Sequence, residues 1–118
     1  MIPLGNTTDV APDAELLSEG RAQRLGSLLA ALGHPVRLRL LLRILADPAG
    51  EVCVCDMVDL FDLSQPTVSH HLRTMRTAGL ISSRRQGTWA YYSVPGEVRD
   101  WVVPMLAGAP DNPGQPDT

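Results

Sequence analysis

Two short helical patterns joined by a tight turn constrain the fold of this chain more than any other feature. The first pattern covers residues 54–61 and the second covers residues 65–78, with Asp62-Leu63-Ser64 between them. Ser64 suits a helix N-cap, Pro66 suits the first turn of the second helix, and Gly79 suits its C-cap. This arrangement predicts a helix-turn-helix motif.

The hydrophobic period changes after Gly79. Residues 80–85 and residues 88–94 have strand-like sequences, and Gln86-Gly87 between them supplies a turn. These residues predict a β-hairpin, which forms a wing beside the helix-turn-helix. The fold class expected from the sequence is therefore mainly α with a β-hairpin (α+β), a winged helix-turn-helix.

Apolar spacing predicts three further helices. They cover residues 14–32, residues 36–46 with Pro35 in the first turn, and residues 96–106. A length of 118 residues is that of one domain. We expect a flexible arm over residues 1–13, one winged helix-turn-helix domain over residues 14–106, and a disordered tail over residues 107–118.

Charge is distributed unevenly along the chain. The net charge is −3, but residues 64–94 contain Arg73, Arg76, Arg84 and Arg85 and no acidic residue. A compact basic segment within an acidic chain is typical of a DNA-binding surface. The alternative is a solvated surface that carries four arginines, and charge alone does not choose between the two.

The second helix of the motif has the composition of a DNA-reading helix. Val68, Leu72 and Met75 form an inward stripe, and His71 lies close to this stripe, so we expect a partly buried, hydrogen-bonded histidine. The helix contains no Glu or Lys, unlike an ordinary solvated helix face, and its outward side chains are of the kinds that read base edges in a major groove. The predicted DNA-binding residues are Gln65, Thr67, Ser69, His70 and Arg73 on this helix, and Arg84 and Arg85 at the tip of the wing.

Other classes of protein find little support in the sequence. No apolar run approaches the length of about 20 residues that crosses a membrane. The first residues lack the features of a signal peptide, and the chain has two cysteines, so we expect a reducing, cytoplasmic location. No nucleophile–base signature, Gly-rich phosphate loop or paired-carboxylate site is found, so we expect no enzyme.

Three blocks between residues 32 and 94 together resemble a known family. They read LGHPVRLRLL, EVCVCDMVDLFDLSQPTVSHHLRTMRTAGLI and RRQGTWAYYSV. In this combination the chain resembles the ArsR/SmtB family of metal- and metalloid-sensing repressors. The resemblance implies a homodimer that pairs through its first and last helices, binds an inverted-repeat operator in double-stranded DNA, and leaves the DNA when an inducer binds. The predicted dimer interface comprises Leu25, Leu28, Trp101, Val102 and Met105 on these two helices.

The segment Cys53-Val54-Cys55-Asp56 is also shared with this family. The arsenic-responsive branch has a third cysteine three residues after the second, where this chain has Val58. The resemblance implies that Cys53 and Cys55 bind arsenite or antimonite as the inducer, and soft thiolates do select soft ions. The alternatives are another soft metal (cadmium, lead or zinc), a redox response, inert cysteines, or a DNA-binding module without a small effector.

Helix geometry limits how these two cysteines could share one ion. Residues i and i+2 of an α-helix point about 200° apart. Both sulfurs can converge only if the chain around residues 53–55 is extended or unwound. We therefore expect ligand binding to favour a distorted start of the third helix, which leads directly into the reading helix.

Overall fold

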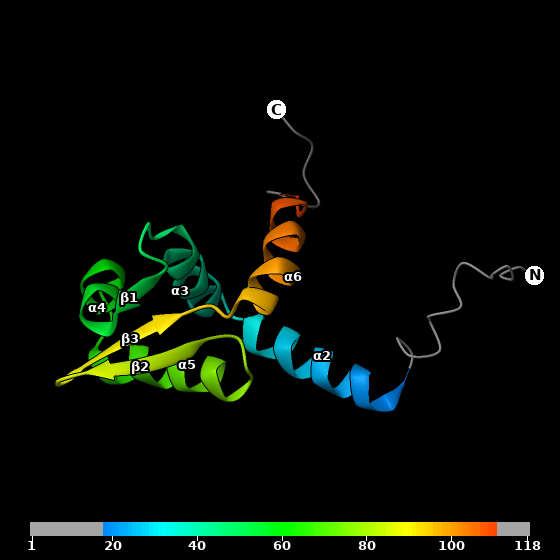
Figure 1. Ribbon diagram of the computed structural model, residues 1–118, viewed down its shortest axis with the longest axis horizontal. Helices are drawn as coiled ribbons and strands as arrows, with labels where there is room; N and C mark the ends of the chain where they lie inside the picture. Colours follow the sequence, from blue (N-terminus) through cyan, green and yellow to red (C-terminus); the bar gives the residue numbers. More distant parts are fainter. Residues whose placement is uncertain (1–17, 111–118) are drawn as a thin grey trace, which may run out of the picture.

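The structure, a computed structural model, describes residues 18–110 (Figure 1). The predicted arm over residues 1–13, the start of the first predicted helix over residues 14–17, and residues 111–118 of the predicted tail lie outside the described residues. In chain order the elements are α2 (Glu19–Leu32), α3 (Pro35–Ala46), β1 (Glu51–Cys53), α4 (Val54–Phe61), α5 (Gln65–Thr77), β2 (Ser82–Gln86), β3 (Trp89–Ser93) and α6 (Gly96–Ala107).

The helix-turn-helix, formed by α4 and α5, lies where the sequence predicts it. The bounds of α4 agree with the prediction, and α5 ends one residue earlier than predicted. Ser64 caps α5, because its hydroxyl accepts a hydrogen bond from the Thr67 N–H at 3.3 Å. Gly79, after the end of α5, has a φ of 89°, a conformation that glycine adopts without strain.

A three-stranded antiparallel sheet in the order β1-β3-β2 corrects the prediction of a hairpin alone. β2 and β3 form the predicted hairpin, but the turn is Gly87-Thr88, because Gln86 already pairs with Trp89. The additional strand β1 pairs its Cys53 with Tyr91 of β3. The sequence does not predict β1, because three residues are too few for an alternating pattern to appear.

One hydrophobic core joins α3, α4, α5 and the sheet. Val68, Leu72 and Met75 of α5 are fully buried, as predicted. Leu80 and Ile81, predicted as the start of the first wing strand, instead lie before β2 and are buried in the core. The other buried core side chains of α3 and α4 are Leu40, Leu41, Ile44, Val54, Met57 and Phe61.

Helices α2 and α6 lie at the end of the molecule remote from the wing, and Figure 1 shows α2 extending away from the remaining elements. Only Ala31 and Leu32 of α2, and only Val102 of α6, are buried. Val102 is 0% exposed, so it has no surface left for a partner and is a core residue, which corrects its assignment to the dimer interface. Within residues 18–110, no helix is long and apolar enough to cross a membrane.

Candidate nucleic-acid interface and thiol pair

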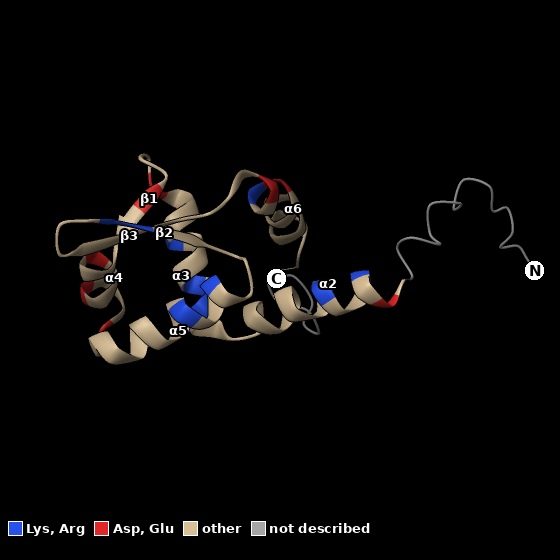
Figure 2. Ribbon diagram, turned by 60° about the horizontal axis from the view of Figure 1, so that its bottom comes forward, with Lys and Arg blue, Asp and Glu red and all other residues tan. Residues whose placement is uncertain are grey.

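Helix α5 presents a polar face without acidic residues to solvent. Because its apolar stripe lies in the core, Gln65, Thr67, His70 and Arg73 are exposed and Ser69 is half-buried. Figure 2 shows basic residues of α5 on the face turned toward the viewer, with no acidic residue on this helix. All five residues that the sequence predicts on this helix are therefore accessible to some degree.

The first turn of α5 is held in place by its N-cap. The Ser64 hydroxyl accepts from the Thr67 N–H and donates to Thr67 Oγ1 at 2.8 Å. In helix-turn-helix proteins, the N-terminal residues of the second helix are those that contact base edges. The cap therefore fixes the position of Gln65 and Thr67, the two candidates nearest to that end.

His71 lies on the buried side of α5 and joins three helices. It is 9% exposed, and its Nδ1 accepts a hydrogen bond from Arg37 Nε of α3 at 3.2 Å, which confirms the prediction of a hydrogen-bonded histidine. Arg37 also donates from Nη1 to the carbonyl oxygen of Ala31, in the last turn of α2, at 3.3 Å. Arg37 thus holds α2, α3 and α5 together, a role that the sequence pattern does not reveal because His71 is 34 residues away.

The surroundings of His71 favour its neutral form. Burial lowers the pKa of His71, and the nearby charges of His34, Arg37 and His70 lower it further. The His34 ring centroid lies 4.6 Å from that of His71, so the two imidazoles are close neighbours. A protonated Nδ1 could no longer accept the hydrogen bond from Arg37.

His71→Asn is expected to flatten the pH dependence of stability between about pH 7.5 and about pH 5.5. In the unfolded chain His71 titrates at its ordinary pKa of 6.5, whereas in the folded protein this pKa is lower. Wild-type stability is therefore full above pH 6.5 and falls as the pH drops through the folded pKa. Urea unfolding across this range measures the effect, and His70→Asn, on the exposed face, is the control. Equal pH slopes for wild type and His71→Asn would contradict this role.

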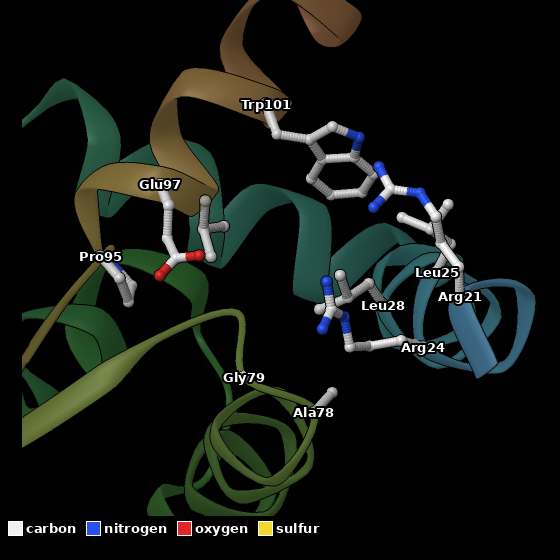
Figure 3. A pocket seen from close by; sticks show the side chains of 10 residues that line it. Arg21, Arg24, Leu25, Leu28, Ala78, Gly79, Pro95, Glu97 and Trp101 are labelled. Carbon is white, nitrogen blue, oxygen red and sulfur yellow. The ribbon is translucent and has the colours of Figure 1, made fainter. Parts of the chain in front are cut away.

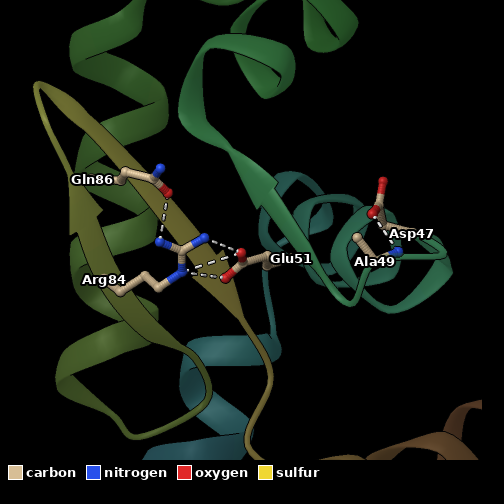
Figure 4. Close-up of polar contacts among 5 residues, drawn as sticks. All are labelled: Asp47, Ala49, Glu51, Arg84 and Gln86. Atoms are coloured by element: carbon tan, nitrogen blue, oxygen red, sulfur yellow. Dashed lines mark hydrogen bonds and ion pairs between the residues drawn. The ribbon is translucent and has the colours of Figure 1, made fainter.

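The two predicted wing arginines have different surroundings. Arg84 of β2 forms an ion pair with Glu51 of β1, and its hydrogen bonds lower the pKa of the Glu51 carboxyl (Figure 4). Arg85 is exposed beside the hairpin turn and, within the part of the chain that the structure describes, forms no ion pair. Arg84 is therefore held on the sheet, while Arg85 projects into solvent near the tip.

Cys53 and Cys55 lie where β1 ends and α4 begins. Cys53 is the N-cap of α4, with an extended backbone (φ −73°, ψ 145°), and Cys55 is in the first turn. Their Cα atoms are 5.3 Å apart and their sulfurs are joined in a disulfide. The chain at Cys53 is therefore extended, which is one of the two geometries predicted to let the sulfurs converge, because Cys53 precedes the helix and follows strand geometry. The expected distortion of α4 when a ligand binds stays a prediction.

The thiol pair is a site with two sulfurs. Cys53 is 6% exposed and Cys55 is half-buried. Among residues 18–110, no three His, Cys, Asp or Glu side chains lie close enough together to hold a metal ion. Val58 is half-buried and lies one turn after Cys55 on α4, where a cysteine side chain would share its face.

A pocket of about 470 Å³ lies between α2 and α6 (Figure 3). Leu25 and Leu28 of α2 and Trp101 of α6 line it, with Arg24 and Glu97 at its polar side. Further along α6, Met105 is 38% exposed. Four of the five residues predicted for dimer contacts, all except Val102, therefore keep apolar side-chain surface that is not buried in the core.

Comparisons with known proteins agree on one kind of regulator. Residues 34–83 match the family described as "Bacterial regulatory protein, arsR family". The chain is 42% identical to the arsenic resistance transcriptional regulator ArsR1 of Pseudomonas putida, over 68% of this chain and 61% of that protein. It is 32% identical to the arsenical resistance operon repressor of Staphylococcus xylosus, over 68% of this chain and 74% of that one. The match thus spans less than two thirds of the Pseudomonas regulator's length.

A solved structure shares the fold. HlyU from Vibrio cholerae superposes with a TM-score of 0.68 at 25% sequence identity, covering 76% of this chain and 96% of HlyU. The superposition includes most of the described residues, so the arrangement of α4, α5 and the wing is shared by a solved protein.

Proposed function

Because this chain belongs to the ArsR family of bacterial regulatory proteins, we propose that it is a transcriptional repressor that binds an inverted-repeat operator as a homodimer and is released by arsenite or antimonite. One observation carries the proposal of DNA binding: the exposed, acid-free face of α5, on a capped helix that follows a tight turn. The names of the Pseudomonas and Staphylococcus relatives support both repression and arsenic as the signal.

The proposed DNA contacts divide by chemistry. Gln65 can pair with an adenine edge and Arg73 with a guanine edge, because these side chains offer two hydrogen-bonding groups in the right geometry. Ser69, Thr67 and His70 can bond bases or phosphates from the same exposed face. Arg85 can reach backbone phosphates from the wing, and Arg84 can do so only if it leaves Glu51.

The proposed dimer uses the surface around α2 and α6. Leu25, Leu28 and Trp101 line the pocket between these helices, and Met105 is exposed nearby. Apolar surface of this kind is typically covered by a partner. A twofold dimer presents two copies of α5, which suits an operator with two half-sites about one helical turn apart.

The proposed inducer site is the pair Cys53 and Cys55. Both sulfurs already converge on one point, and soft thiolates bind the soft metalloid well. Arsenite binds the reduced pair: each thiol gives up its proton, two As–S bonds replace two As–OH bonds, and two water molecules leave. The bound arsenic would tie the end of β1 to the start of α4, the helix that leads into α5. Allosteric release requires that the inducer make different contacts in the DNA-bound and the released state of the protein, and a change at this boundary would provide that difference.

A second candidate signal is oxidation. The two sulfurs are joined in this structure, so a dithiol–disulfide change at Cys53 and Cys55 is a competing way to move the same strand and helix. Cadmium, lead and zinc remain candidates as soft or borderline ions.

Titration of a labelled duplex from the region upstream of the gene tests this proposal. The reduced protein, kept in a thiol-free reductant, is expected to bind as two copies per duplex and to dissociate when arsenite is added. Cadmium and zinc are added in parallel experiments, and the thiol oxidant diamide is added in another after the reductant has been removed. Release by diamide but not by arsenite would replace the arsenic proposal with the redox one. Binding of a single copy would contradict the dimer.

A further inference from the structure

Each guanidinium nitrogen of Arg84 is hydrogen-bonded within the protein. Nε donates to Glu51 Oε2 at 3.0 Å, Nη2 donates to Glu51 Oε1, and Nη1 donates to Gln86 Oε1 at 3.0 Å (Figure 4). The guanidinium carbon also lies 4.8 Å from the centroid of the Tyr91 ring. A wing arginine that the sequence predicts as a DNA contact is therefore hydrogen-bonded to the protein through all three of its guanidinium nitrogens, although its side chain is 50% exposed.

Glu51 reaches Arg84 across the sheet. β1 and β2 lie on opposite edges of β3, where Glu51 pairs with Ser93 and Arg84 pairs with Tyr91. The two charged side chains meet over β3, and the carboxylate accepts hydrogen bonds from two guanidinium nitrogens. Arginine binds phosphate through the same bidentate geometry. Glu51 thus occupies the position that a backbone phosphate would take on Arg84.

Arg85 provides an internal contrast. It follows Arg84 on the same strand, so its side chain points to the opposite face of the sheet. It is exposed, and within residues 18–110 it forms no ion pair. Of two adjacent wing arginines, one has its charge neutralised by a carboxylate and the other does not.

The ion pair is open to competition. The Arg84 and Glu51 side chains are 50% and 27% exposed. Ion pairs this accessible to water contribute little to stability. A duplex carries a dense row of phosphates, so it can compete for Arg84, but it must first displace the carboxylate.

We infer that Glu51 is a positioning residue that holds Arg84 away from DNA and so lowers the affinity of the wing for the phosphate backbone. The inference rests on the proposed function, since it requires that the wing meets DNA. Phosphate contacts dominate binding to DNA of any sequence. Because Glu51 keeps Arg84 from contacting phosphate, a larger share of the binding free energy comes from the base contacts of α5.

Glu51→Gln is expected to tighten binding to a labelled mixed-sequence duplex by about threefold for each subunit, the size expected for one exposed charge pair, and so by about tenfold for the dimer. The glutamine keeps the size of the side chain but removes the charge that holds Arg84. One more arginine of each subunit then contacts phosphate, so for the dimer the plot of log affinity against log salt concentration should steepen by about 2. Anisotropy titrations over a salt series measure both changes.

Two matched variants separate this effect from a general change of charge. Asp59→Asn removes one exposed carboxylate from α4 without freeing an arginine, so it should leave the salt slope unchanged. In an Arg84→Gln background, Glu51→Gln should bring no gain in affinity. Equal gains from Glu51→Gln and Asp59→Asn, or a gain that persists without Arg84, would overturn the inference.

Arg84→Gln alone gives an independent test if Glu51→Gln fails to fold, which thermal unfolding would reveal. Because Glu51 already withholds Arg84, this variant should keep the wild-type salt slope. A slope shallower by about 2, one for each subunit, would mean that Arg84 contacts phosphate in the wild type, and the inference would be wrong. If the wild type binds neither the upstream duplex nor the mixed-sequence duplex, the proposed function is overturned as well. If the wild type binds DNA and Glu51→Gln changes neither the affinity nor the salt slope, this inference alone is overturned.

Discussion

Arg73→Ala is expected to weaken binding to the operator duplex by about 5- to 150-fold for each subunit, because each subunit of the dimer loses one base contact of about 1–3 kcal/mol. Arg73 is exposed on α5, while the same helix is anchored in the core by Val68, Leu72 and Met75. Truncation of Arg73 therefore removes a contact without removing support for the helix. Anisotropy titration of the labelled upstream duplex measures the loss, and thermal unfolding should show an unchanged fold.

Arg99→Ala is the matched control for Arg73→Ala. Arg99 is exposed on α6, away from α5 and the wing, so its loss removes the same charge from a surface that should not meet DNA. Its effect on operator affinity should be small. Gln65→Ala, at the first residue of α5, should weaken binding as Arg73→Ala does. Operator affinity that is unchanged in both the Gln65 and the Arg73 variant would contradict the assignment of α5 as the reading helix.

Salt dependence then distinguishes a base contact from a phosphate contact at Arg73. If Arg73 reads a guanine edge, Arg73→Ala should relax specificity at one base pair in each half-site. If it contacts phosphate, the loss should be uniform across sequences and the salt slope should fall by about 2, one for each subunit. Operator variants with single base-pair changes, tested against both proteins, separate the two outcomes.

The sequence predicts the helix-turn-helix well because its signals are local. Ser64, Pro66 and Gly79 act within one or two turns of the helix that they bound, and the stripe on α5 has helical period. Strand β1 escapes prediction because it depends on pairing with β3, about 40 residues later, rather than on its own pattern. The contact between Glu51 and Arg84 is not predicted for the same reason, because the two residues are 33 residues apart in the chain.

In the candidate site, too, the sequence predicts local features and misses contacts between residues that are distant in the chain. The helix predicted over residues 54–61 correctly leaves Cys53 outside α4, but the pattern does not reveal that Cys53 ends a strand that pairs with β3, about 40 residues later. An amphipathic stripe on α6 likewise identifies Val102 as inward-facing without telling whether its neighbour is the core or a partner. In both cases the residue type is informative, and its position relative to an element boundary or a distant neighbour decides the outcome.

Cys53→Ser and Cys55→Ser are each expected to leave operator binding intact and to abolish release at the arsenite concentrations that release the wild type. A serine hydroxyl stays protonated at neutral pH, so it offers the metalloid no thiolate. The fold should survive, because the Cys53 sulfur accepts the Cys55 N–H as a helix cap, and serine is a preferred residue at this position. Neither cysteine lies on the exposed face of α5, so the DNA contacts are unchanged.

The two serine variants should fail alike. The chain has two cysteines, so either substitution leaves one sulfur, and a single sulfur cannot chelate. Loss of the second, intramolecular contact should raise the arsenite concentration needed for release by about 100-fold or more. The measurement is an arsenite titration of the labelled duplex complex with reduced wild type and with each variant. If Cys53→Ser still releases DNA at the wild-type concentration, these cysteines are not the arsenite sensor.

Val58→Cys should shift the same titration in the opposite direction. Residue 58 follows Cys55 by one turn of α4 and is half-buried, so a cysteine there adds a sulfur on the same face of the helix. A third thiolate would complete the coordination that the pair alone leaves open, and release should need less arsenite than in the wild type. Val58→Ala is the control, because it makes a similar reduction in side-chain volume without a sulfur. If Val58→Cys and Val58→Ala respond alike, the third sulfur does not reach the bound metalloid.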